Sequence, residues 1–142
     1  MKAAMATSSA QALHRYRLRR GLPESACTPD GGLRVLAGDG IRMSLQEAPN
    51  ATIVLRARVG ALPREPEARA RMVCRVGAFA AGLMRVSPAS CTIDAEGYVL
   101  HLWQRLAAGC SEPEFDESVA LFARTCQMWR EMLTQLEQRV GL

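Results

Sequence analysis

The sequence lacks three motifs that commonly mark enzymes. Its 142 residues contain no phosphate-binding loop, no GxGxxG and no HExxH, and the two histidines, His14 and His101, lie 87 positions apart. Asp94 and Glu96 lie close together, and paired carboxylates can transfer protons, but no nucleophile or oxyanion donor can be placed beside them. We therefore expect no catalytic activity. His101, between two leucines, is interpreted as a satisfied interior or interface histidine.

The sequence also lacks the cysteine spacing of a metal site or a disulfide framework. No CxxC occurs, and the five cysteines lie too far apart to be neighbouring ligands. They are Cys27, Cys74, Cys91, Cys110 and Cys126. An odd and dispersed set of cysteines is typical of free thiols in a reducing cytosol. The sequence predicts no metal and no cofactor.

Long apolar runs are absent too. No run approaches the roughly 20 residues of a membrane span, and the first residues lack the apolar core of a secretory signal, so we expect a cytoplasmic protein. Hydrophobic residues make up 49% and charged residues 23% of the chain, which excludes a wholly disordered protein. We predict a flexible segment at residues 1–7 and a single domain over residues 8–142.

Lysine is almost absent, because a single lysine accompanies 17 arginines. The net charge is +4, but residues 1–23 carry +5 and no acid, so the rest of the chain sums to −1. A nucleic-acid-binding domain usually carries its basic excess on the folded body, so we do not expect nucleic acid to be the main partner. The alternative is a basic-arm nucleic-acid-binding or regulatory protein that uses Arg15, Arg17, Arg19 and Arg20.

The first half of the chain reads as a helix followed by three strands. Ser8 or Ser9 can cap a helix that ends near residue 20, before Gly21 and Pro23. A loop over residues 23–32 follows. Strands are expected at 33–37, 41–47 and 52–59. Their side chains alternate, which predicts an antiparallel meander with one apolar and one arginine-rich face.

The second half reads as helix, two strands and helix. A helix is expected over residues 66–85, strands over 90–95 and 98–106, and a final helix after the capping box at 111–114. In the final helix apolar residues recur every three or four positions, which favours a helix lying on the sheet over a two-stranded coiled coil. The whole order, α-βββ-α-ββ-α, predicts an α+β domain with a twisted antiparallel sheet.

Two features of the sequence leave undecided whether the chain itself or a partner covers certain surfaces. Gly77, Ala78, Ala81 and Gly82 give one helix face almost no side chain, so another backbone can approach it. That backbone belongs either to the chain's own sheet or to a second copy. The strand at 98–106 is apolar on both faces, so it is either buried on both sides or covered by a partner.

This order of elements resembles the class I type III secretion chaperones, the Tir-chaperone or CesT-like family, over about residues 8–135. The segments that carry the resemblance are LRVLAGDGIRMSL (33–45), TIVLRARV (52–59) and YVLHLW (98–103). The resemblance implies a small homodimer without catalytic residues. Such a chaperone binds the N-terminal part of a secreted effector in extended form, keeps it soluble and presents it to the secretion ATPase. An adaptor of the same fold outside any secretion system is a further alternative.

Candidate site residues follow from what an unfolded client needs, namely apolar grooves and free strand edges. The candidates for effector binding are Leu13, Tyr16, Leu18, Val35 and Val54. The candidates for the dimer interface are Val76, Phe79, Leu83, Val99, His101 and Trp103. The alternative interpretation of each effector-binding candidate is an ordinary core residue.

Overall fold

The chain folds as one five-stranded antiparallel sheet with three α-helices, in a computed structural model that describes residues 8–38 and 40–140. The expected α+β class and element order are confirmed. The elements are α1 (Ser9–Arg19), η2 (Glu24–Ala26), β1 (Leu33–Ala37), β2 (Ile41–Ala48), β3 (Thr52–Ala61), α2 (Pro66–Leu83), β4 (Ser90–Ile93), β5 (Val99–Ala107) and α3 (Glu112–Val140). The predicted flexible segment at 1–7 lies outside the described residues. No described helix combines the length and apolar character that crossing a bilayer requires.

The strands lie in the order β1-β2-β3-β5-β4, so β3 and β5 are central and β1 and β4 form the edges. The β1–β2 hairpin turns through Gly38 and Gly40, whose φ angles of 52° and 86° are strained for other residues. The strand predicted at 90–95 ends at Ile93. Its early end has a local cause: the Asp94 carboxylate accepts hydrogen bonds from the backbone N–H groups of Tyr98 and Val99, at 2.9 and 3.0 Å, and so closes a turn.

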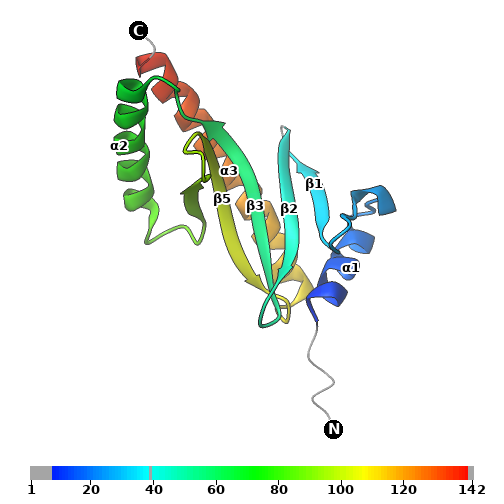
Figure 1. Cartoon of the computed structure of the whole chain (residues 1–142). Coiled ribbons are helices and arrows are strands. Elements are labelled where there is room, and N and C mark those ends of the chain that lie inside the picture. Colours follow the sequence, from blue (N-terminus) through cyan, green and yellow to red (C-terminus); the bar gives the residue numbers. More distant parts are fainter. Residues whose placement is uncertain (1–7, 39, 141–142) are drawn as a thin grey trace.

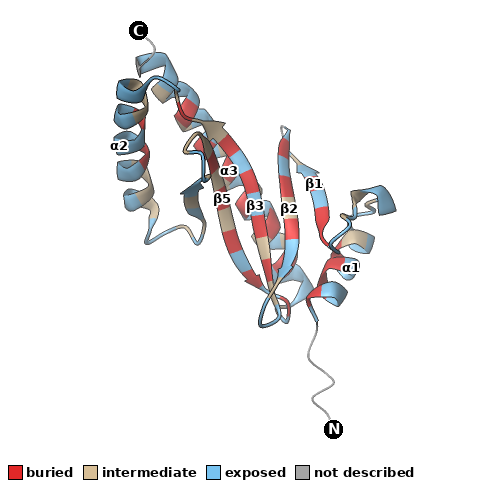
Figure 2. Cartoon of the chain, viewed as in Figure 1, coloured by how far each residue is buried: buried red, intermediate tan, exposed pale blue. Residues whose placement is uncertain are grey.

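The core lies between one face of the sheet and helices α1 and α3. Helix α3 crosses behind the sheet in Figure 1, and Figure 2 shows buried positions alternating with more exposed ones along the central strands. The buried stripe of α3 consists of Phe115, Val119, Phe122, Cys126, Trp129 and Leu133. The interpretation of this helix as one that lies on the sheet is therefore confirmed. Its predicted capping box is present, since the Ser111 hydroxyl accepts from the Glu114 N–H at 3.2 Å.

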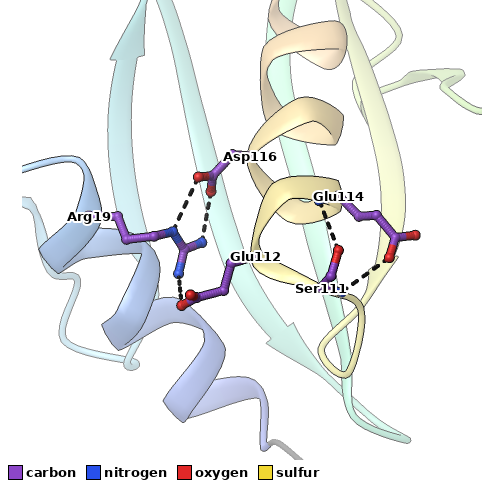
Figure 3. Close-up of polar contacts among 5 residues, drawn as sticks. All are labelled: Arg19, Ser111, Glu112, Glu114 and Asp116. Atoms are coloured by element: carbon purple, nitrogen blue, oxygen red, sulfur yellow. Dashed lines mark hydrogen bonds and ion pairs between the residues drawn. The ribbon is translucent and has the colours of Figure 1, made fainter.

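Arg19 joins the first helix to the last (Figure 3). Its guanidinium donates to Glu112 at 2.5 Å and to both carboxylate oxygens of Asp116 at 2.7 and 3.2 Å. It also lies over the rings of Tyr16 and Phe115, with 5.8 and 5.9 Å from its Cζ to the ring centroids. The hydrogen bonds to Asp116 and Glu112 raise the pKa of Arg19, so its guanidinium stays charged at any physiological pH. This arginine therefore fixes α1 on the N-terminal turn of α3.

We expect Arg19→Ala to lower the free energy of unfolding by about 1 kcal/mol, because a forked ion pair and ring contacts are lost together. Urea denaturation measures the loss. In a double-mutant cycle with Asp116→Ala, the combined loss should be smaller than the sum of the two single losses. Arg15→Ala, on the same helix and exposed, serves as the control and should change stability by less than about 0.5 kcal/mol. Strict additivity would show that the contact contributes nothing.

Candidate functional site: the open face of the sheet

One face of the sheet carries no helix in the part of the chain that the structure describes (Figure 1). Strand alternation sends every second side chain to this open face, because the intervening ones fill the core. Five arginines lie there. We call the four on β1 to β3 the arginine face: Arg34 on β1, Arg42 on β2, and Arg56 and Arg58 on β3. The fifth, Arg105 on β5, lies opposite Val54. The predicted arginine-rich face of the meander is thus present, and it is turned away from the helices.

Pairing between strands sets the neighbours of these arginines. Arg56 lies opposite Ser44 on one side and Trp103 on the other. Arg58 lies opposite His101, and Arg42 lies opposite Leu36. The four arginines, with Leu36, Ser44 and His101, line a shallow hollow of about 450 Å³ whose described lining contains no acid. The arginines give this hollow a positive charge, and Leu36 gives it exposed apolar surface.

His101 adds little charge to this face. Partial burial, and then the nearby Arg56 guanidinium, lower the pKa of His101, while Asp94 acts in the opposite direction. Its Nδ1 atom is buried and has no hydrogen-bond partner among the described residues. The imidazole is therefore neutral at pH 7, and the positive charge of the hollow comes from the arginines.

The acidic pair noted in the sequence has a structural role on the side of Asp94. Hydrogen bonds from the backbone N–H groups of Val99 and Tyr98 lower the pKa of this carboxyl, so it remains ionised and accepts the hydrogen bonds that close the turn.

Burial raises the pKa of Cys91 to about 11 and that of Cys126 to about 12, so both thiols stay protonated. Across residues 8–38 and 40–140, no three metal-ligating side chains gather into a site.

The predicted effector-binding residues divide into two groups. Leu13, Tyr16 and Val35 are buried in the core of the chain. Leu18 is 59% exposed on α1, and Val54 is half-buried on the open face. Effector binding at these five positions stays a prediction, and only the second group is reachable without rearrangement of the core.

Sequence reasoning missed Leu36, which is 69% exposed within the arginine face. The signal was present: Leu36 lies two positions after Arg34 and therefore shares its outward direction on β1. Leu36 therefore adds exposed apolar surface to a face that is otherwise rich in arginine.

The predicted dimer residues also fall into two places. Val76 is buried, Leu83 is half-buried, and Phe79 packs edge-on against Trp129 of α3 with ring centroids 5.0 Å apart. Val99, His101 and Trp103 are half-buried on the open face of β5. Within the described chain this strand is therefore covered on one side only. Dimer contacts at these residues stay a prediction.

Most of α2 is exposed (Figure 2). Two of its glycines contact no other element: no atom lies within 4 Å of a Cβ built on Gly77 or Gly82, the helix's own backbone aside. The interpretation that these glycines admit the chain's own sheet is therefore wrong. Exposed, uncharged residues three or four positions apart form a stripe that we call the α2 face: Ala70, Val73, Cys74, Gly77, Ala81 and Met84.

These features define an α+β protein with a helix-covered and an open sheet face, and the comparisons with solved structures place the fold. A chain of the ExsC–ExsE complex matches with a TM-score of 0.67 and 17% identity, over 91% of this chain and 97% of its own. A chain of the HopA1–SchA chaperone–effector complex matches with a TM-score of 0.62 and 13% identity, over 84% and 91%. A chain of the complex between the Yersinia pestis type III secretion chaperone SycH and a fragment of YscM2 matches with a TM-score of 0.58 and 15% identity, over 86% of this chain and 99% of its own.

The chain therefore has the fold of the class I type III secretion chaperones, as the resemblance implied. YbjN from E. coli, provisionally described as a transcription regulator, also matches, with a TM-score of 0.54 and 16% identity over 96% of this chain and 98% of its own. No protein-family model matches the sequence, and no curated protein matches it.

Proposed function

We propose that this chain is a type III secretion chaperone that binds the N-terminal segment of a secreted effector in extended form. The observation that carries the proposal is its fold, which matches nearly the whole length of chains solved in complexes such as HopA1–SchA. The proposal includes a homodimer, a place in the bacterial cytoplasm and delivery of the client to the secretion ATPase. It includes no catalytic step, because the sequence contains no catalytic motif.

The open face and the sheet edges support the binding of an unfolded client. An extended segment needs backbone partners or apolar contacts to offset the entropy it loses on ordering. Strands β1 and β4 lie at the edges of the sheet, where strand addition takes place. At the start of β1, Leu33 is already bridged by Cys27, so addition to β1 would use the rest of that strand. Leu36 and Val54 provide aliphatic contacts on the open face.

The experiment is co-expression of the tagged chain with each secreted protein encoded beside it. We expect one client to copurify at a fixed stoichiometry, and a client without its N-terminal segment to be lost. Retention of the truncated client, or copurification of none, would contradict the proposal. The control is the same client with its C-terminal part removed, which should be retained.

A regulatory protein that binds nucleic acid is the second candidate, because YbjN shares the fold. The structure limits the basic arm that this function would use. Arg19 is held by Glu112 and Asp116, and Arg17 donates to the carbonyl oxygen of Leu22 at 3.2 Å. Arg15 and Arg20 remain exposed. Binding to duplex DNA that weakens steeply with salt would favour this candidate.

A further inference from the structure

We infer that the arginine face binds an acidic segment of extended polypeptide with aliphatic residues among its acids. The inference rests on the proposed function for the source of that segment, which would be the effector. It adds the chemical class of the client segment and the surface that binds it.

The spacing of the arginines fits an extended peptide. Arg56 and Arg58 are two positions apart on β3, so their Cα atoms lie roughly 6.6 Å apart along the strand. Alternate residues of an extended peptide have the same separation, so carboxylates at every second position can meet successive guanidiniums. Arg42 and Arg34, on the two strands beyond β3, widen the cationic surface across the sheet.

The charges of this face are not neutralised by ion pairs within the described chain. The ion pairs found among residues 8–38 and 40–140 are those of Arg19 with Glu112 and Asp116. The hydrogen bond from the Thr28 hydroxyl is the main cause that lowers the pKa of Asp30, in the loop before β1, and the Arg34 guanidinium adds a smaller contribution. Among the described residues, Arg42, Arg56 and Arg58 form no ion pair. Guanidinium groups bind carboxylates in a forked geometry.

Two other occupants fit this face less well. A second copy would bring like charges together, which opposes association. Proteins that bind single-stranded nucleic acid commonly stack successive bases on open aromatic side chains. Trp103 is the aromatic residue on this face among the described ones, and the Cζ atom of Arg105 already lies over its ring, 5.7 Å from the centroid. Leu36 and Val54 offer aliphatic contacts instead.

The test uses the full chain and two labelled synthetic peptides of equal length, one alternating Glu with Val and the other alternating Lys with Val. Fluorescence anisotropy at low salt measures both affinities. We expect the acidic peptide to bind at least about tenfold more tightly, and Arg56→Glu with Arg58→Glu to remove that preference and favour the basic peptide. A variant that had merely unfolded would not gain affinity for the basic peptide.

The matched control is Arg124→Glu with Arg139→Glu, two exposed arginines of α3 that change the net charge equally. It should keep the preference for the acidic peptide. The inference is overturned if the wild type binds both peptides alike, or if the control loses as much as the face variant. Tighter binding of single-stranded DNA than of the acidic peptide, lost in the same face variant, would overturn it in favour of nucleic acid.

A client complex separates this inference from the proposed function. If the client copurifies equally well with the face variant, the arginine face is not the client site, although the chaperone function stands. If no client copurifies with the wild type, the proposed function fails, and the peptide measurements still decide the chemistry of the face.

Discussion

Replacement of Gly77 by arginine is expected to convert the proposed dimer into a monomer. Gly77 lies in the middle of the α2 face, where an added Cβ has no neighbouring atom within 4 Å, the helix's own backbone aside. Arginine is also the better helix former by roughly 0.6–1 kcal/mol, so the fold of the single chain should not suffer. A second copy packed on this face would lose its close approach and face a buried charge, and we expect the dimer to weaken by at least about 100-fold.

Light scattering during size-exclusion chromatography measures this change, from twice the chain mass of 15.5 kDa to that mass. Ala120→Arg, at an exposed position of α3, serves as the control and should leave the dimer intact. Gly77→Arg is a cleaner test than Phe79→Asp, because Phe79 packs on Trp129 and its loss would also weaken the monomer. A monomeric wild type would contradict the proposed dimer, and a variant that remains dimeric would show that the dimer does not form through the α2 face.

Exposed apolar residues near the α2 face support this choice of interface. Within the described residues, four of the eight large apolar side chains that are exposed lie on α2, on the turn after it or on β4. They are Val73, Met84, Val86 and Ile93. Apolar exposure concentrated on one side of a small protein indicates a surface that a partner covers.

Phe122→Ala should destabilise the chain by about 3–5 kcal/mol, the range for removing a large aromatic side chain from a core. Phe122 is fully buried at the middle of the α3 stripe, among the residues that seal the sheet. Such a loss is a large fraction of the roughly 5–15 kcal/mol by which native proteins are stable. Urea denaturation with far-ultraviolet circular dichroism gives the difference in the free energy of unfolding.

The neighbouring residue provides the control for this prediction. Leu121 is 44% exposed on the outer side of the same helix, so Leu121→Ala changes the helix without opening the core. It should cost less than about 1 kcal/mol. Similar losses for the two variants would show that α3 does not pack on the sheet through the stripe described above.

Most helices and strands of the fold can be predicted from local patterns in the sequence. The two-residue alternation in β2 and β3, the capping box at Ser111 and the apolar periodicity of α3 are each decided by neighbouring residues. Helix and strand boundaries differ from the predicted ones by a few residues, for example at Asp94, where a side chain closes a turn.

The candidate site was less accessible to sequence reasoning. Periodicity places Leu13 and Val35 on apolar faces, but it does not say whether the chain itself or a partner covers those faces. In the structure the chain covers both. The contacts between Arg19 and α3 span 93 and 97 positions, and no local pattern predicts which acids such an arginine meets. The arginine face itself was predictable, since alternation alone assigns its residues to one side.

The position of α3 in the chain has a consequence for biosynthesis. The ribosome makes the five strands before α3, so the sheet surface that α3 covers stays uncovered while the nascent chain is still growing. Helix α1 is made even earlier than the strands, and the acids that bind Arg19 are translated more than 90 codons after it. Folding is therefore completed only after α3 has emerged, and until then the nascent chain exposes the kind of apolar surface to which molecular chaperones bind.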